Sequence, residues 1–374
     1  MLTYQCHDCG QTYGLHEGAW RCSCGGAFDL SGAPSFASFD SVDSRQWSLW
    51  RYRHALPLVG ADDHGVQVTL GEGCTPVVQA GEGVLVKLDF AMPTLSFKDR
   101  GSSLLVSAAK GLGAEHLVAD SSGNAGTSIA AYAASAGIHA EVFVPSSTSP
   151  GKVAQLDAYG ADVRLVEGNR AETAQAAVAR VTESGAFYAS HAYNPFFHHG
   201  VKTFSFECFE QLGGTLPDAI LLPAGNGTLL IGAGIGFAEL AASGLLHRVP
   251  RLYAVQADRC APLASARGVA TAESGKTAAE GIAVAEPPRL AQMLEVVDAS
   301  GGDVLTVREG EIQRARSDLL RLGIYVEPTA AVAYAAIEKL GEARPDSILV
   351  PLTGAGLKSS GTRGQPSWQR LSGS

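Results

Sequence analysis

Short apolar strands alternate with helical segments along most of this chain, and this alternation is the strongest constraint on its fold. The predicted strands are bounded by glycine or proline, a pattern typical of βαβ units built around parallel sheets. We therefore expect an α/β fold with ligands at the carboxyl ends of the strands. The predicted strands span residues 84–88, 116–119, 139–144, 163–166, 219–222, 252–255 and 348–352. The predicted helices span residues 102–111, 124–136, 150–159, 171–183 and 200–212.

The bulk composition excludes several classes of protein. With 374 residues, 46% of them apolar, the chain is long enough for two domains. A net charge of -9 argues against non-specific binding to nucleic acids or acidic membranes. No apolar run reaches the roughly 18 residues of a membrane-spanning helix, and the first residues lack the pattern of a secretory signal. We expect a soluble, cytoplasmic protein.

Lys98 lies in the segment Pro93-Thr94-Leu95-Ser96-Phe97-Lys98-Asp99-Arg100-Gly101, between a predicted strand and a predicted helix. A lysine in such a loop can be partly desolvated and held beside a second cation, here Arg100. Both effects lower the pKa of an amine and make it a nucleophile for an aldehyde. We hypothesise that Lys98 forms a Schiff base with pyridoxal phosphate. The alternative is a solvated surface lysine.

Two glycine-bearing loops each follow a predicted strand and open a predicted helix. The loop at 120–126 can hold a carboxylate on the free N–H groups of its helix, and Asn124 could bond a phenolic oxygen. The alternative there is an ordinary helix cap. The loop at 223–229 offers Gly225, Asn226, Gly227 and the Thr228 hydroxyl for a phosphate.

The same region does not fit a dinucleotide-binding fingerprint. The third glycine of that motif would fall on Leu230 or Phe237, depending on the starting glycine. A nicotinamide fold is therefore disfavoured. Thr353 follows the last predicted strand and could offer its hydroxyl to a ring nitrogen, although a turn threonine is the simpler interpretation.

Four of the seven cysteines lie within the first 24 residues, as Cys6-x-x-Cys9 and Cys22-x-Cys24. Closely spaced thiolates beside glycines can converge on one ion, and four sulfur ligands suit structural Zn²⁺. The odd cysteine count also favours a metal site over a disulfide framework. The alternative is a degenerate, metal-free ribbon.

Several motifs in the same order give the chain a family resemblance. They are the Lys98 segment, Ser121-Ser122-Gly123-Asn124, Tyr193-Asn194-Pro195-Phe196-Phe197, Gly200-Val201-Lys202-Thr203, Gly225-Asn226-Gly227-Thr228, Val255-Gln256-Ala257, Ala279-Glu280-Gly281-Ile282, Glu327-Pro328-Thr329 and Leu352-Thr353-Gly354. The chain resembles fold-type-II pyridoxal-phosphate enzymes of the tryptophan synthase β superfamily, and the threonine synthase family most closely. Two positions depart from the family's usual residues: Leu95 replaces glycine, and His199 replaces glutamate.

The resemblance implies a role for each matching residue. Lys98 is implied as the lysine that carries the cofactor, Phe97 as the residue beside its ring and Asn124 as the partner of the ring hydroxyl. Gly225 to Thr228 are implied to hold the cofactor phosphate, and Thr353 to contact the pyridine nitrogen. The implied reaction is a lyase reaction that converts O-phospho-L-homoserine and water to L-threonine and phosphate.

The substrate residues are predicted from charge and from their place in the motifs. Ser96, Arg100 and Lys202 are our candidates for binding the phosphate of the substrate. Arg100 and Lys202 could equally be structural, each paired with an acid. The loop residues Ser121, Ser122 and Gly123 complete the predicted substrate site.

The predicted organisation has three parts. Residues 1–30 form a zinc-ribbon-like appendage, residues 31–104 and 205–374 a large cofactor-binding domain, and residues 105–204 a smaller inserted domain. Many relatives are dimers, so a homodimer is one expected assembly. Two other functions stay open: a related enzyme, such as a threonine or serine dehydratase or a phosphoserine β-replacement synthase such as cysteate synthase, and a non-catalytic zinc-ribbon binding protein.

Overall fold

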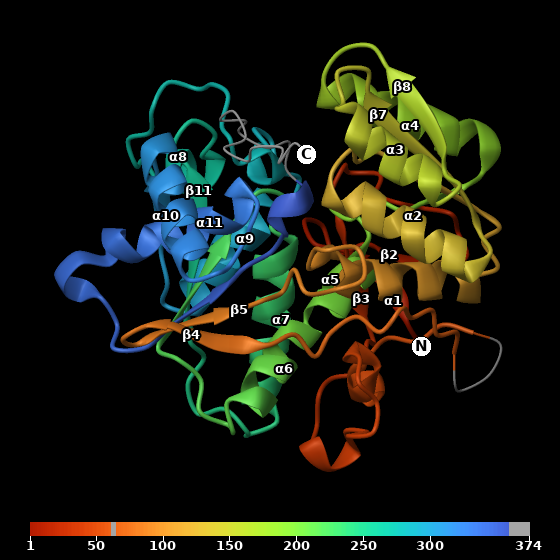
Figure 1. The fold of residues 1–374 in the computed structure, drawn as a ribbon. Coiled ribbons are helices and arrows are strands. Elements are labelled where there is room, and N and C mark those ends of the chain that lie inside the picture. The colour runs from red at the N-terminus through yellow and green to blue at the C-terminus, as the bar shows by residue number, and fades with distance from the viewer. Residues whose placement is uncertain (61–64, 359–374) are drawn as a thin grey trace, which may run out of the picture.

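The computed structural model describes residues 1–60 and 65–358, which form three sheets (Figure 1). The N-terminal sheet is antiparallel, in the order β2-β1-β3. Its strands are β1 (Thr3–Cys6), β2 (Thr12–Gly14) and β3 (Phe28–Ser31). This small ribbon precedes the two larger bodies of the molecule.

The smaller of the two main sheets is parallel throughout, in the order β8-β7-β6-β9. Its strands are β6 (His116–Ala119), β7 (His139–Pro145), β8 (Asp162–Val166) and β9 (Phe187–Tyr188). The helices α2 (Asn124–Ala136), α3 (Pro150–Ala158) and α4 (Arg170–Ser184) connect these strands and gather around them in Figure 1.

The larger sheet has the order β12-β11-β10-β13-β5-β4 and is parallel except for its edge strand β4. Its strands are β4 (Val77–Gly81), β5 (Val84–Lys87), β10 (Ala219–Pro223), β11 (Arg251–Ala257), β12 (Val304–Val307) and β13 (Ile348–Pro351). Its later helices are α7 (Thr228–Ala242), α8 (Pro262–Ala266), α9 (Leu290–Ala299), α10 (Glu309–Arg321) and α11 (Pro328–Ala335).

Three further helices connect strands of one main sheet to strands of the other. They are α1 (Lys98–Gly111), between β5 and β6, and α5 (Pro195–Val201) and α6 (Thr203–Gln211), between β9 and β10. Short 3-10 helices complete the fold: η1 (Phe39–Ser41), η2 (Leu49–Ala55), η3 (Glu280–Ile282), η4 (Ala336–Ala343) and η5 (Gly356–Lys358). None of the helices within residues 1–60 and 65–358 has the length and apolar character needed to cross a membrane.

The predicted fold class is confirmed: two bodies built on parallel strands follow an N-terminal cysteine ribbon. The strands of the smaller sheet all lie within residues 105–204. The domain boundaries themselves stay a prediction, and the end of the third segment, residues 359–374, lies outside the described residues.

Two predicted helices differ from the observed ones in an informative way. The helix expected from residue 102 begins at Lys98, without a side-chain cap at Phe97. Asp99 in the first turn suits the positive end of the helix dipole, and its carboxylate also accepts from the Thr94 N–H of the preceding loop at 2.7 Å. The helix expected at 200–212 is two helices. The first begins with Pro195 after the Asn194 cap, and the second follows a junction at Lys202.

The segment of residues 31–60, which connects the ribbon to the larger body, packs on that body. Trp50 and Tyr52 of η2 are buried. The Trp50 indole donates to the Ser103 hydroxyl on α1 at 2.9 Å and to the Glu72 carboxylate at 3.0 Å. The connector therefore contributes both apolar area and hydrogen bonds to the core beside α1.

A fully buried network of charges joins α1, α6 and the end of β5. Arg100 pairs with Asp89 at 2.6 Å and with Glu207 at 2.8 Å, and Glu207 also pairs with Lys87 at 2.6 Å. Burial alone would raise the pKa of Glu207, but the Arg100 and Lys87 cations outweigh burial and hold this pKa well below its usual range. Each charge is thus compensated inside the protein, and the network fixes α1 against the larger body.

We expect Glu207→Ala to lower the free energy of unfolding by about 3–5 kcal/mol, because it leaves the cations of Lys87 and Arg100 buried with too few partners. Denaturant unfolding at neutral pH measures the loss. The control is Arg321→Ala, which removes an exposed pair with Asp318 and should cost less than about 1 kcal/mol. Similar losses in the two variants would contradict the structural role of the network.

Candidate active site

Backbone pairing with the segment after β13 positions the loop that carries Lys98. Ser96 and Gly354 form an antiparallel bridge, and the Phe97 N–H donates to the Thr353 carbonyl at 3.0 Å. Leu95 has a φ of 64°, which is left-handed and costs a residue with a side chain about 1–2 kcal/mol. The departure from glycine at this position therefore keeps the loop shape at a small energetic cost.

The Lys98 amine points into a narrow cavity. Its Nζ donates to the Thr228 hydroxyl at 2.8 Å and lies 4.5 Å from the centroid of the Phe97 ring. Burial lowers the pKa of Lys98 to about 7, against a weaker opposing effect of Glu327. A substantial fraction of this amine is neutral and nucleophilic near neutral pH. The predicted cause was half right, because burial contributes but the Arg100 cation is not among the causes.

The two predicted glycine loops meet at this cavity, each at the start of a helix. Ser121, Gly123 and Asn124 line it at the N-terminus of α2, and the loop of residues 225–228 lines it at the N-terminus of α7. Gly227 has a φ of 76°, and a Cβ on Gly225 would come within 2.8 Å of the Ile282 Cα. Glycine is therefore required at both positions for the loop to hold its shape.

A third group of polar atoms closes the cavity. The Thr353 hydroxyl is buried and has no hydrogen-bond partner among the described residues, an uncommon state for a buried polar atom. The Asn124 amide donates to the Glu327 carboxyl at 3.0 Å, and burial raises the pKa of that carboxyl. Thr353 is thus free to bond a ligand.

These residues fit pyridoxal phosphate. Lys98 supplies an amine for the aldehyde, the 225–228 loop supplies N–H groups and a hydroxyl for the phosphate, and Thr353 supplies an unpaired hydroxyl for the ring nitrogen. Phe97 and Asn124 line the same cavity, and the contact of Asn124 with the ring hydroxyl stays a prediction. A roomier groove, of about 1140 Å³, lies between the ribbon and the smaller sheet, but no lysine of residues 1–60 or 65–358 lines it.

Four predicted substrate residues do not line this cavity. Arg100 is buried in the network with Asp89 and Glu207, and Lys202 pairs with Glu239 at 2.7 Å. Both cations are paired with acids away from the cavity. Arg100 and Lys202 therefore have the structural role that the sequence left open, and their assignment to the substrate phosphate is corrected. Ser96 is buried within the Lys98 loop, and neither Ser96 nor Ser122 is among the described residues that line the cavity.

Three titratable residues that line the cavity were not among the predicted site residues. Arg170 comes from the start of α4, His191 from the loop before α5, and Glu327 from the cap of α11. The His191 Nε2 accepts a hydrogen bond from the Asn226 side-chain amide at 3.1 Å, and burial lowers the pKa of His191 well below its ordinary value. Glu327 belongs to the motif Glu327-Pro328-Thr329, whereas Arg170 and His191 belong to no sequence motif that would indicate a place in the site.

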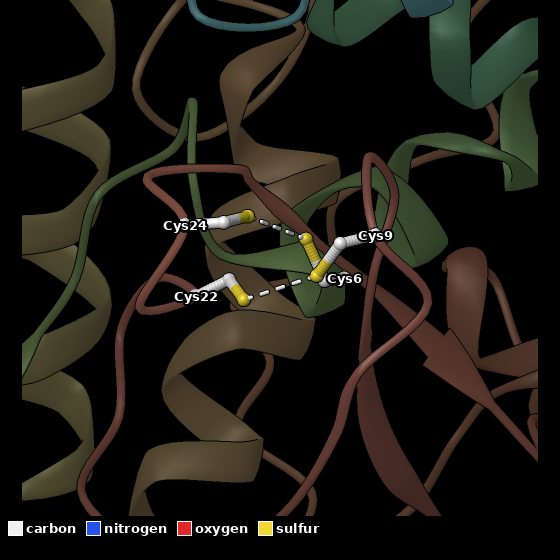
Figure 2. A group of neighbouring side chains, drawn as sticks. All are labelled: Cys6, Cys9, Cys22 and Cys24. Atoms are coloured by element: carbon white, nitrogen blue, oxygen red, sulfur yellow. Dashed lines mark hydrogen bonds between the residues drawn. The ribbon is translucent and has the colours of Figure 1, made fainter.

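The four N-terminal cysteines form a separate cluster (Figure 2). Their sulfur atoms all lie within 4.8 Å of one another, and the pairs Cys6–Cys24 and Cys9–Cys22 are each 3.5 Å apart. Gly10 and Gly25, which follow the two cysteine pairs, have positive φ values of 75° and 94° and allow the loops to turn. The thiols converge as the spacing predicted.

Comparison with known proteins identifies the family. A family model described as pyridoxal-phosphate dependent enzyme matches residues 68–354. The chain belongs to this family. Its cofactor is therefore pyridoxal phosphate, and the family acts on small amino-acid substrates.

Curated relatives narrow the resemblance to threonine synthases. The chain is 32% identical to the threonine synthase of Methanocaldococcus jannaschii, over 96% of this chain and 93% of the relative. It is also 32% identical to the threonine synthase of Mycobacterium tuberculosis, over 83% of this chain and 88% of the relative. The family member described here is a threonine-synthase-like, pyridoxal-phosphate-dependent lyase.

Solved structures agree on the fold-type-II architecture. A threonine deaminase of T.th. is 27% identical with a TM-score of 0.62, covering 73% of this chain and 87% of that one. An O-ureido-L-serine synthase is 24% identical with a TM-score of 0.65, covering 76% and 90%, and shows the fold alone.

We expect cofactor-free protein to bind pyridoxal phosphate faster as the pH rises through about 7. Above this pH the Lys98 amine is neutral, whereas an ordinary lysine with a pKa of 10.5 stays protonated. Stopped-flow absorbance measures the rate, with Nα-acetyl-lysine as a reference that carries the titration of the cofactor itself. A rate profile parallel to that of the free amine would refute the lowered pKa, and Lys98→Ala should abolish the signal.

Proposed function

We propose that this enzyme converts O-phospho-L-homoserine and water to L-threonine and phosphate. The observation that carries the proposal is the half-buried Lys98 amine, set between Phe97 and Thr228 in a cavity lined by the start of α2 and the start of α7. The threonine synthases that match most of the chain support this choice of reaction.

Each cavity residue has a defined task in this reaction. When bound, the cofactor supplies an electron sink for charge developed on the substrate carbon atoms. Lys98 is the base and acid that moves protons at Cα, Cβ and Cγ, and its pKa of about 7 suits both directions of transfer. Phosphate leaves from Cγ by elimination, and water then adds at Cβ.

The start of α2 is the proposed place for the substrate carboxylate. The α2 helix has 13 residues, and its first N–H groups have no partner within the helix. Ser121 and Gly123 line the cavity at this end. A carboxylate here would leave the rest of the substrate directed along the cavity, past Lys98.

A second candidate is a related reaction on another amino acid. The similarity to a threonine deaminase at 27% identity favours it, as does the Ser-Gly-Asn-Ala-Gly sequence that begins α2. A dehydratase would release a 2-oxo acid and ammonia. A β-replacement synthase acting on phosphoserine would release phosphate without forming threonine. The products therefore distinguish these reactions from the first proposal.

We also propose that Cys6, Cys9, Cys22 and Cys24 bind one structural Zn²⁺. Zn–S bonds of about 2.3 Å at tetrahedral angles place the sulfur atoms about 3.8 Å apart. The observed pairs at 3.5 Å and the outer limit of 4.8 Å lie around this value. The predicted homodimer and cytoplasmic location stay predictions.

Purified enzyme with pyridoxal phosphate and O-phospho-L-homoserine should release threonine and phosphate in equal amounts. Amino-acid analysis and a phosphate assay measure both products, and Lys98→Ala is the inactive control. Absence of threonine would reject the proposed reaction. The same enzyme is then given threonine, serine or phosphoserine: a 2-oxo acid with ammonia would select a dehydratase, and phosphate release from phosphoserine with a second nucleophile would select a β-replacement synthase.

Metal analysis should find about one zinc per chain in protein purified without chelators. Cys22→Ser should lose the metal and lower the melting temperature by on the order of 5 °C, because metal binding contributes to folding of the ribbon. Cys260→Ser, outside the cluster, is the matched control and should retain the zinc. A full zinc complement in Cys22→Ser would exclude this ligand set.

A further inference from the structure

The cavity contains a cation whose purpose the reaction chemistry of Lys98 does not explain. Among the described residues, Lys98 and Arg170 are the lysine and arginine side chains that line it. Lys98 carries the cofactor in the proposed function, and its pKa is lowered to about 7. Arg170 is therefore the permanent positive side-chain charge of the cavity, since a guanidinium does not lose its proton in proteins.

Arg170 is held over the cavity from the smaller body. It is the first residue of α4, after the Asn169 cap, and its Nη2 donates to the Glu280 carbonyl in the larger body at 3.2 Å. No carboxylate oxygen in residues 1–60 and 65–358 lies within the 4.0 Å of an ion pair with it. Arg170 is exposed at this edge of the cavity, so its charge is solvated and accessible to a ligand, whereas the charges of Arg100 and Lys202 are buried and paired.

Within the described residues, the neighbouring acids and the imidazole form no ion pair with Arg170. Burial raises the pKa of Glu327, which already accepts a hydrogen bond from Asn124. Burial also raises the pKa of Asp120, with Arg170 opposing, and lowers the pKa of His191, which keeps the imidazole neutral. A ligand anion would therefore be the partner of Arg170.

The cavity then has three positions for anions. The glycine loop at α7 suits the cofactor phosphate, the start of α2 suits the substrate carboxylate, and Arg170 suits one further anion. Guanidinium groups bind phosphate through paired, charge-assisted hydrogen bonds. We propose that Arg170 binds the phosphate of the substrate and so selects phosphorylated amino acids over uncharged ones. This rests on the proposed function, because it takes the substrate carboxylate to lie at α2.

The competing role for Arg170 is a purely structural contact between the two bodies. Lys152 of α3 makes a comparable contact, since its Nζ pairs with the Glu280 carboxylate at 2.8 Å. Lys152 does not line the cavity. It is therefore a matched control that loosens the same turn without removing a charge from the cavity.

The test compares two ligands that cannot react by phosphate loss. One is 2-amino-5-phosphonopentanoate, in which CH2 replaces the bridging oxygen of phosphohomoserine, and the other is norvaline, which lacks the phosphonate. Binding to the holoenzyme is measured by the change in cofactor absorbance. Arg170→Gln should weaken phosphonate binding about 10- to 100-fold and change norvaline binding by less than about 3-fold. Arg170→Lys should restore part of the lost affinity, and Lys152→Gln should retain the preference for the phosphonate.

Three results would overturn the assignment: equal losses for both ligands in Arg170→Gln, the same selective loss in Lys152→Gln, or a wild-type enzyme that binds the two ligands equally well. Circular dichroism confirms that each variant is folded. Failure of the proposed reaction is recognised separately. An enzyme that binds the phosphonate through Arg170 but makes no threonine from O-phospho-L-homoserine keeps the anion site and loses that reaction.

Discussion

The position of the Lys98 amine depends on a few backbone hydrogen bonds between its loop and the segment after β13. The Phe97 N–H bonds the Thr353 carbonyl, and the Ala355 N–H bonds the Leu95 carbonyl. This pairing places the amine, the unpaired Thr353 hydroxyl and the start of α7 around one cavity, although they come from distant parts of the chain. A Cβ on Gly354 would come within 2.2 Å of the Glu327 carboxyl, so a larger residue there would disturb this arrangement.

Three consecutive residues of α1 show where inference from sequence proximity fails. Successive side chains on a helix point about 100° apart. Lys98 therefore faces the cavity, Asp99 bonds Thr94 and Ser128, and Arg100 enters the buried charge network. The sequence placed the three in one loop, where all could meet a ligand. Because the helix begins at Lys98, the three side chains point in different directions although the residues are adjacent in the chain.

The parts of the site that could be predicted are the residues that belong to short sequence motifs. A glycine loop between a strand and a helix has the same meaning wherever it occurs, so Asn124, Gly225 and Thr228 could be assigned to the cavity before any coordinates. Arg170 and His191 reach the cavity through the packing of α4 and of the loop before α5, and no local pattern records that packing. The alternation of strands and helices likewise predicted both parallel sheets, but not the break between α5 and α6.

The electrostatics of the cavity follow from how its charges are distributed. The strong ion pairs of Arg100, Glu207 and Lys202 are buried in the scaffold, where they fix helices. Inside the cavity, desolvation lowers the pKa of Lys98 and raises the pKa of Glu327, and both shifts favour the neutral form of the group. The remaining fixed fields, from Arg170 and two helix starts, are all positive. Such a cavity is complementary to a negatively charged ligand. Groups whose pKa values favour the neutral form can gain or lose a proton at little cost, and so can transfer protons at the substrate carbons.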